Sequence, residues 1–453
     1  MRHAIGDAGG HQGGSGRAPA RGAGPLTTVH LEPDARLIYA AGFLRSATVS
    51  LVGVTLAIHL ADVGFSATQI GLLIGVGLAG SSLAMVIVSL RGDAWGRRRV
   101  LIGLTVLSAT GYIALALFAH AVALVPLAFI GMLNGMGRDR GAASALDQAI
   151  LPEIVSMDRR TWALAWYNLV LDAGHALGAL AATIPTIVMR VAAVTPDAAH
   201  RATFVMCAGA MLACIVPYLA LTPRIEVATR PDSPARVPRL DARSKRVITR
   251  LALLFGLDSI GGGFLNSALI AYWFFRRYGM SEADLAVLFF AARALNALSH
   301  VAAAWMARRI GLLNTMVWTH LPSSLFLIAA PASPTAPIAA ALFLAREALV
   351  EMDVPTRQSY VMAVVKPGER TFASGVTNVT RNVAWAVGPS VAGAVMQHVA
   401  LAGPLVVGGL LKIGYDLILY TSFRHVRPPE EEVSCSGQRP AARSKWDAKQ
   451  ASR

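Results

Sequence analysis

Residues 67–90 read ATQIGLLIGVGLAGSSLAMVIVSL, a stretch without one charged side chain. A helix needs about 20 consecutive apolar residues to cross the hydrocarbon core of a bilayer. Similar uncharged stretches occupy residues 100–119 and 202–222. Because hydrocarbon offers the backbone no hydrogen-bond partners, we expect each stretch to form a helix. The sequence therefore predicts a helical membrane protein.

The composition of the whole chain agrees with a membrane location. Of its 453 residues, 55% are hydrophobic and 15% are charged, and the mean hydropathy is +0.52. Soluble domains carry about 25% charged residues, so this composition excludes an ordinary soluble enzyme. The three cysteines, Cys207, Cys214 and Cys435, are too few for a disulfide framework.

Further apolar stretches extend the series in both directions. The stretch 310–345 is uncharged for 36 residues, which is too long for one span, and its prolines predict a hairpin inside it. We therefore predict an all-α integral membrane protein with twelve transmembrane helices. The predicted spans are 36–60, 67–90, 100–119, 122–150, 160–189, 201–222, 250–275, 281–307, 311–331, 336–365, 370–398 and 401–422.

Basic residues are distributed unevenly between the predicted loops. The two tails and the even-numbered loops hold 29 of the 41 Lys and Arg residues, and the odd-numbered loops hold four. By the positive-inside rule, both termini and the linker 223–249 face the cytoplasm. We expect a multi-pass protein of the plasma (inner) membrane, with disordered cytoplasmic tails at 1–35 and 424–453. The net charge of +15 is then a topology signal, and we expect no nucleic-acid partner.

An internal repeat divides the chain into two halves. Shifting residues 148–178 by 210 positions aligns them with residues 358–388, and the matches include several chemical types. The identities are Gln148 with Gln358, Arg160 with Arg370, Thr161 with Thr371, Ala163 with Ala373, Asn168 with Asn378, Ala176 with Ala386 and Gly178 with Gly388. The sequence therefore predicts two pseudo-symmetric six-helix bundles in parallel orientation, residues 36–222 and 250–423.

The loop between the second and third predicted helices carries a motif. It reads Ser89-Leu90-Arg91-Gly92-Asp93-Ala94-Trp95-Gly96-Arg97-Arg98. The pattern of Asp93, Gly96, Arg97 and Arg98 resembles the corresponding loop of the major facilitator superfamily (MFS). The two six-helix halves are similar to the fold of that family, so the resemblance covers residues 36–423.

This resemblance implies a secondary transporter that works by alternating access, with the substrate near the bilayer midplane between the halves. It also implies that Asp93, Gly96, Arg97 and Arg98 form a cytoplasmic gate, and that the chain is a monomer. We expect Asp93 to cap the eleventh helix near Thr371, where the helix dipole favours an anion. The alternative is that these arginines only fix the topology.

Ionisable side chains inside the predicted spans are functional candidates, because charges in hydrocarbon are costly and usually face a cavity or a partner. Eight are basic: Arg45, Arg138, Arg140, Arg293, Arg346, Arg357, Arg381 and Lys412. Eight are acidic: Asp139, Asp147, Asp172, Asp258, Glu347, Glu351, Asp353 and Asp416. Equal numbers favour pairing. We expect Lys412 with Asp416, and Asp353 with Arg357, to neutralise each other at i,i+4 spacing.

The run Arg138-Asp139-Arg140-Gly141 falls near the middle of the fourth predicted helix. Three consecutive residues spread over about 200° of a helix surface, so at least one is expected to face the interior. We take Arg138 and Asp139 as candidates for substrate or proton binding. A structural ion pair is the alternative.

The fifth predicted helix carries a polar stripe, because Asn168, Asp172 and His175 lie at i, i+4 and i+7. The repeat maps these three residues onto Asn378, Asn382 and Trp385. Matched polar faces suit a shared cavity wall, and an Asp–His pair has the chemistry for proton coupling near neutral pH. Interhelical hydrogen bonding is the alternative.

The remaining candidates lie on the first, seventh, tenth and eleventh predicted helices. Glu347 and Glu351 are expected to stack at i,i+4 beside Arg346, so that one carboxylate stays protonated. Further cavity candidates are Arg45, Asp258, Asn266 and Arg381.

These features predict a secondary transporter of a small organic solute. No phosphate-cradling loop or metal-ligand motif is present, so we expect no cofactor, no metal and no enzymatic activity. Numerous titratable groups in the spans favour proton-coupled efflux by antiport. The alternative is proton-coupled uptake by symport of a polar or anionic metabolite, held by Arg45, Arg138, Arg346 and Arg381. A transport-inactive membrane sensor or scaffold is a remote alternative.

Overall fold

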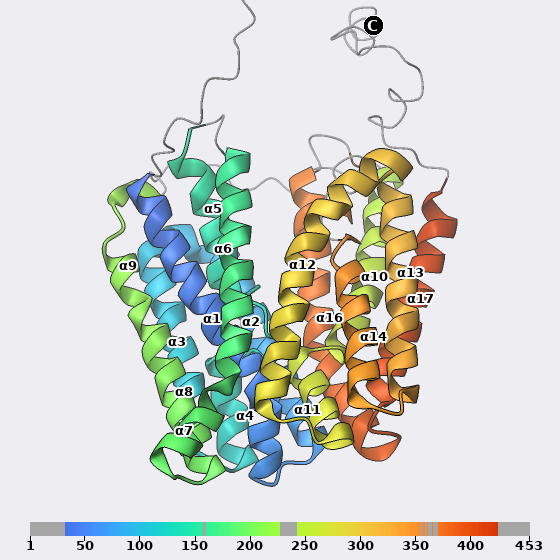
Figure 1. Cartoon of the computed structure of the whole chain (residues 1–453). Helices are drawn as coiled ribbons and strands as arrows, with labels where there is room; N and C mark the ends of the chain where they lie inside the picture. The colour runs from blue at the N-terminus through green and yellow to red at the C-terminus, as the bar shows by residue number, and fades with distance from the viewer. Residues whose placement is uncertain are drawn as a thin grey trace, which may run out of the picture.

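The computed structural model describes residues 32–156, 160–226, 242–353, 356–357, 360, 365 and 370–424. Every regular element in this part of the chain is a helix, as the sequence predicts (Figure 1). The predicted tails lie almost entirely outside the described residues, and so does most of the linker.

The helices follow the predicted spans in order. The first half holds α1 (Pro33–Asp62), α2 (Ala67–Trp95), α3 (Arg97–Leu117), α4 (Ala121–Ile130), α5 (Ala142–Ile154), α6 (Arg160–Leu180), α7 (Ile184–Ala192), α8 (Pro196–Ala213) and α9 (Ile215–Leu219). The second half holds α10 (Ala242–Phe264), α11 (Ser267–Tyr278), α12 (Glu282–Ile310), α13 (Leu312–Ala329), α14 (Ala336–Val350), α16 (Arg370–His398) and α17 (Gly403–Phe423). Within the described residues, eight helical segments are long and apolar enough to cross a membrane, and the count of twelve stays a prediction.

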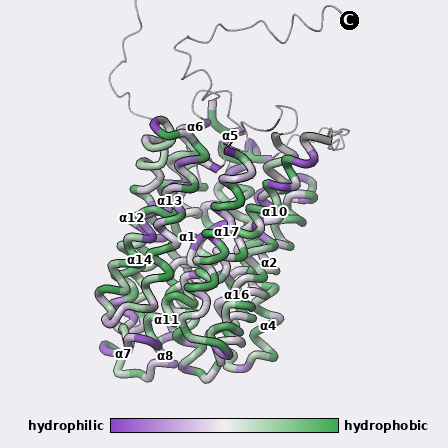
Figure 2. The backbone as a smooth tube through the Cα atoms, turned by 90° about the vertical axis from the view of Figure 1, so that its right-hand side faces the viewer, coloured by the Kyte–Doolittle hydropathy of each residue, from purple (hydrophilic) through white to green (hydrophobic). Residues whose placement is uncertain are grey.

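The two halves form two helical bundles that stand side by side, the first in blue to green and the second in yellow to red (Figure 1). Within the halves, α1 packs along α6 and α10 packs along α16. Between the halves, α2 packs along α16 and α6 packs along α12. Figure 2 shows hydrophobic residues over the full height of the bundles, as a surface in contact with lipid requires.

The bundles are in close contact at the end that carries the loops 63–66, 193–195 and 279–281, which we call the external end after its predicted orientation. A Cβ atom at Gly71 on α2 would lie 2.3 Å from the carbonyl oxygen of Pro389 on α16, so only glycine fits there. Nearby, the backbone N–H of Ala67 donates a hydrogen bond of 3.2 Å to Gln397 Oε1. The external end is therefore closed.

The fourth predicted span, 122–150, is not one continuous helix, and that expectation was wrong. It divides into α4 and α5, which are joined by an irregular segment at 131–141. Asn134 stabilises the irregular turn, because its side chain donates to the Arg138 carbonyl at 2.7 Å and accepts from the Met136 N–H at 2.8 Å. Gly137 adopts a φ of 66°, which a glycine tolerates without strain.

This irregular segment contacts the other half where the seventh predicted span is also broken, between α10 and α11. The Ala268 N–H donates to the Gly135 carbonyl at 3.1 Å, and the Ser267 hydroxyl donates to the Met136 carbonyl at 2.9 Å. The two helix interruptions thus supply hydrogen-bond donors to each other's backbone carbonyls at the interface. Irregular backbone inside a membrane needs such partners.

The tenth predicted span, 336–365, is interrupted as well. Its first helix, α14, ends at Val350, and Glu351 is the C-cap residue. The sequence has a proline at position 355, which has no N–H to bond the carbonyl of residue 351. Glu351 therefore lies at the end of a helix, where its side chain is free to turn away from that of Glu347.

Candidate functional site

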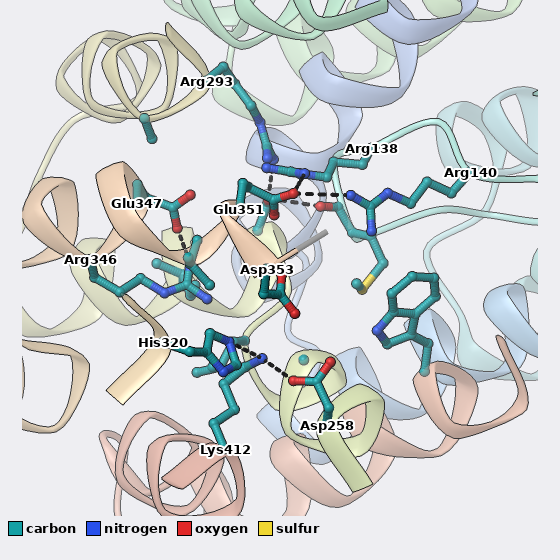
Figure 3. A pocket seen from close by; sticks show the side chains of 18 of the residues that line it. Arg138, Arg140, Asp258, Arg293, His320, Arg346, Glu347, Glu351, Asp353 and Lys412 are labelled. Atoms are coloured by element: carbon teal, nitrogen blue, oxygen red, sulfur yellow. Dashed lines mark hydrogen bonds and ion pairs between the residues drawn. The ribbon is translucent and has the colours of Figure 1, made fainter. Parts of the chain in front are cut away.

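A cavity lies between the bundles, mostly within the second half. Its wall comes from the irregular segment 131–141, from α10, α11, α12, α13, α14, α16 and α17, and from residues shortly after α14. The lining is strongly charged, and Figure 3 shows most of the charged side chains turned toward one another across the cavity.

Basic groups outnumber acidic groups in this wall. Among the described residues that line it, seven are basic: Arg138, Arg140, Arg293, Arg346, Arg357, Arg381 and Lys412. Four carry carboxylates: Asp258, Glu347, Glu351 and Asp353. The predicted spans hold equal numbers of acidic and basic residues, but the cavity wall does not, because several of the acidic residues do not line it.

One side of the cavity is a bridge between the two halves. Arg138 forms an ion pair with Glu351 at 2.9 Å, and Arg140 approaches the same carboxylate oxygen at 3.4 Å (Figure 3). Both arginines reach one carboxylate because the segment that carries them is not helical. On a helix, two residues at i and i+2 would point about 200° apart.

The opposite side is a chain of charges within the second half. Lys412 on α17 contacts Asp258 on α10 at 2.7 Å, and Asp258 also contacts Arg357 at 3.2 Å. Arg357 pairs in turn with Asp353 at 2.5 Å, which confirms the i,i+4 pair expected there.

The expected pair of Lys412 with Asp416 does not form, so that expectation was wrong. Asp416 is bound by His320 Nδ1 on α13 at 3.0 Å, and Lys412 instead lies 3.4 Å from His320 Nε2. Each side chain has a stronger partner on a neighbouring helix than on its own. Helix spacing alone does not reveal such partners.

The two glutamates of the tenth span have different partners, so they do not form the stacked carboxylate pair that we expected. Glu347 forms an ion pair with Arg346 and accepts a hydrogen bond from Asn296 Nδ2 at 2.8 Å. Glu351 faces Arg138 and Arg140 instead. Each carboxylate therefore lies within ion-pair distance of a guanidinium group.

Two arginines in the wall form no ion pair with a carboxylate in the described part of the chain. Arg293 on α12 is 8% exposed; its guanidinium donates to the Ser267 hydroxyl at 2.8 Å, and its Nε has no partner. Arg381 on α16 donates to the Ser259 hydroxyl at 3.3 Å and lies 4.7 Å from the ring centroid of Trp385. These two groups bring uncompensated positive charge to the cavity.

Arg45 and Asp139 are two of the predicted site residues that do not line this cavity. Arg45 is buried inside the first bundle, where it contacts Asp139 at 2.6 Å and Asp147 at 2.8 Å. The hydroxyls of Tyr167 and Tyr218 complete the cluster. Asp139 is thus ion-paired with Arg45 inside the first bundle, and Asp147 is a third member of the cluster that the sequence did not predict.

The polar stripe of the fifth span is only partly gathered at one place. The backbone N–H of Asp139 donates to His175 Nε2 at 2.8 Å, and His175 Nδ1 lies 3.8 Å from Asp172. Asn168 on the same helix and Asn378 on α16 are both exposed. From the matching stripe, Trp385 lines the cavity.

Asn266 marks the break between α10 and α11. Its side chain accepts from the Leu269 N–H at 2.9 Å and donates to the Gly263 carbonyl at 2.9 Å. Asn266 is thus the N-cap of α11 and holds the break in place.

The predicted gate motif forms a compact cluster on the first half. Arg97 contacts Asp93 at 2.7 Å and Glu153 at 2.5 Å, and Gly96 has a φ of 89°. The carboxylate of Glu226 accepts from the backbone N–H groups of Arg97 at 2.7 Å and Arg98 at 3.2 Å. Glu226 therefore caps α3. The Thr371 side chain, which we expected near Asp93, lies outside the described residues.

Some cavity residues were not selected from the sequence. Arg293, His320, Asp353, Arg357 and Lys412 line the cavity. Four of them stood among the intramembrane charges but were not chosen as site candidates. His320, an uncharged histidine in an apolar stretch, was not considered.

Comparisons with known proteins agree with this architecture. The sequence model of the Major Facilitator Superfamily matches residues 38–389. An uncharacterized membrane protein of Saccharomyces cerevisiae, YJR124C, is 26% identical over 423 residues, which cover 86% of this chain and 94% of the yeast protein.

Solved structures of transporters share the fold at low sequence identity. The nucleoside transporter NupG is 14% identical with a TM-score of 0.65, covering 86% of this chain and 98% of that one. A D-xylose-proton symporter is 15% identical with a TM-score of 0.63, covering 86% and 97%. A bacterial homologue of the lysosomal transporter Spinster, in an inward-facing form, is 14% identical with a TM-score of 0.63, covering 86% and 94%. The chain belongs to the Major Facilitator Superfamily of membrane transporters.

Proposed function

We propose that this protein is a proton-coupled carrier of a small organic anion, such as a carboxylate or a phosphate. The observation that carries the proposal is the pair of arginines, Arg293 and Arg381, that face the cavity without a carboxylate partner in the described part of the chain. A buried guanidinium without a counter-ion is costly. An anionic substrate removes that cost when it binds, and a guanidinium can hold its oxygens in a bidentate geometry.

The neighbouring groups fit the same substrate. The cavity holds seven basic groups against four carboxylates, so its centre attracts negative charge. The guanidinium group of Arg381 lies over the ring of Trp385, and that of Arg140 lies 5.4 Å from the centroid of the same ring. A planar or partly apolar anion is therefore favoured over a simple inorganic ion.

Glu351 supplies a route to proton coupling. Its carboxylate forms ion pairs with Arg138 and Arg140, two cations that an incoming anion would also bind. When the substrate takes over these arginines, Glu351 loses two cationic neighbours in a largely buried place, and this loss favours protonation of its carboxylate. Substrate binding and proton binding then favour each other.

The charge of the substrate bears on the direction of transport. Moving one negative charge into a cell against an inside-negative potential costs about 2.3 kcal/mol per 100 mV. A proton that travels with the anion cancels this charge. An anionic substrate therefore favours uptake by symport over the efflux by antiport that the sequence placed first.

The test is transport by the purified protein in proteoliposomes under an imposed pH gradient. A panel of carboxylates, phosphates, neutral sugars and amines is added outside, while a pH-sensitive dye reports the lumen. We expect some anions to enter faster when the outside is acidic and to acidify the lumen as they enter. Entry of neutral or cationic solutes alone would contradict the anion proposal, and alkalinisation of the lumen during anion entry would contradict symport.

A further inference from the structure

The two halves also meet through a titratable pair at the external end, away from the cavity. His200 on α8 of the first half and Glu282, the first residue of α12 in the second half, are 2% and 7% exposed. The distance from His200 Nε2 to Glu282 Oε1 is 2.5 Å. This bond joins the bundles where they close, so it breaks when the external end opens.

The hydrogen-bond partners of His200 determine how many protons the pair carries. His200 Nδ1 lies 2.9 Å from the Pro196 carbonyl oxygen, which only accepts hydrogen bonds. Its Nε2 faces a carboxylate. A neutral imidazole has one N–H and an ionised carboxylate has none, so together they cannot make both bonds. The pair therefore holds one extra proton, on the imidazole or on the carboxylate.

His59, Asp62 and the ion pair of Arg201 with Asp197 are the charged and titratable groups around the pair in the described part of the chain. From α1, the ring of His59 lies 5.2 Å from that of His200, and Asp62 ends the same helix. On α8, Arg201 is paired with Asp197 at 2.8 Å. His59 Nδ1 and Glu282 Oε2 are buried and have no hydrogen-bond partner in the described part of the chain. Loss of the proton would remove one of these two hydrogen bonds, because a neutral imidazole donates either to the Pro196 carbonyl or to the Glu282 carboxylate, but not to both.

We propose that His200 and Glu282 form a proton-binding site that controls closure of the external end. The halves close when the pair binds a proton from the external side, and they open when the pair loses it. The proton enters and leaves on the same side, so it is not transported. This site instead makes the balance between the open and closed forms depend on external pH. The inference rests on alternating access and does not depend on the anionic substrate.

The sign of the effect follows from proton linkage. Closure binds a proton that the open form does not retain, so acidic pH favours the closed form and alkaline pH favours the open form. One coupled proton changes the ratio of open to closed molecules by about tenfold per pH unit within the titration range.

The experiment measures the distance between spin labels on the two halves without substrate. Val122 at the start of α4 and Val399 after α16 are 89% and 78% exposed near the external end. Both are replaced by cysteine, with Cys207, Cys214 and Cys435 changed to alanine, and pulsed electron paramagnetic resonance is recorded from pH 5 to 9. We expect the longer distance to gain population as the pH rises.

Two variants and one control make the assignment specific. His200→Gln should abolish the pH response. His200→Lys, whose charge persists throughout this pH range, should hold the closed form at alkaline pH. His120→Gln, at an exposed histidine in the loop before α4, should respond like the parent. A pH response that survives in both His200 variants, or no response in the parent, would overturn the proposal. Since no substrate is added, this outcome is separate from that of the anion test.

Discussion

The two halves place buried arginines in contrasting surroundings. In the first half, Arg45 is bound by two carboxylates and by the hydroxyls of Tyr167 and Tyr218. In the second half, Arg293 is almost as deeply buried, yet one serine hydroxyl is its hydrogen-bond partner among the described residues. The same side chain is thus saturated with partners in one bundle and short of them in the other.

This difference separates stability from function. A fully paired cluster inside one bundle holds its helices together, and it has no remaining capacity for a ligand. A guanidinium that lacks a counter-ion and faces a cavity destabilises the empty protein and favours an anionic ligand. We therefore assign the Arg45 cluster to the fold and Arg293 with Arg381 to the substrate.

The largest effect is expected for Arg45→Met. This change leaves Asp139 and Asp147 buried near each other without their cation, and breaking a buried ion pair costs about 3–5 kcal/mol. We expect low yield of folded protein and a clearly lower Tm, measured by thermal unfolding in detergent. A variant with normal Tm and no transport would place Arg45 in the transport mechanism instead.

Arg293→Gln and Arg381→Gln should weaken anion binding without lowering stability, which is the opposite of the effect expected for Arg45→Met. A charge-assisted hydrogen bond is worth about 1.5–3 kcal/mol, so we expect each change to weaken anion binding by about tenfold or more. Stability should stay constant or rise, because an unpaired buried charge is removed. The comparison combines initial rates of anion uptake with Tm, and Arg276→Gln, at an exposed arginine near the end of α11, is the control. A matching loss of stability would make these arginines structural.

Glu351→Gln should uncouple the proton from the substrate. The neutral amide leaves Arg138 and Arg140 available to the anion but cannot bind the proton. We expect exchange of anion between the two sides to continue, while acceleration by a pH gradient is lost. Counterflow and gradient-driven uptake in the same proteoliposomes measure the two properties. If the variant still concentrates the anion in response to the gradient, another group carries the proton.

The smallest effect is expected at the break between α10 and α11. Asn266→Ala removes an N-cap, which costs about 1 kcal/mol, and the Arg45 and Arg293 regions both stay intact. We expect Tm to fall by a few degrees with little change in anion affinity. A large loss of affinity would show that this break positions the arginines of the cavity.

The sequence alone predicted the all-helical fold, but it did not predict the contacts between residues that are distant along the chain. Uncharged stretches such as residues 67–90 predict helices because lipid permits little else. The break at 131–141 was missed because it depends on Asn134 and on backbone bonds to Ser267 and Ala268 in the other half. A single-chain pattern shows no such long-range partners.

The sequence predicted that charged side chains line the candidate site, but it did not predict how those side chains pair with one another. Charges in the spans identified Arg138, Glu351 and Arg381 as candidates, and all three line the cavity. Which carboxylate neutralises which base depends on how neighbouring helices are rotated, so Lys412 was paired with the wrong partner. The surplus of positive charge in the cavity became visible only when each pair was located.

The central claim is that unpaired arginines in the second half make an anion site. Its most direct test measures equilibrium binding of organic carboxylates and phosphates to the purified protein, with the shift in Tm as the readout. We predict that at least one anion raises the Tm of the parent and of Arg276→Gln, but not that of the Arg293→Gln/Arg381→Gln double variant. An equal shift in the double variant, or stabilisation by neutral or cationic solutes alone, would contradict the account.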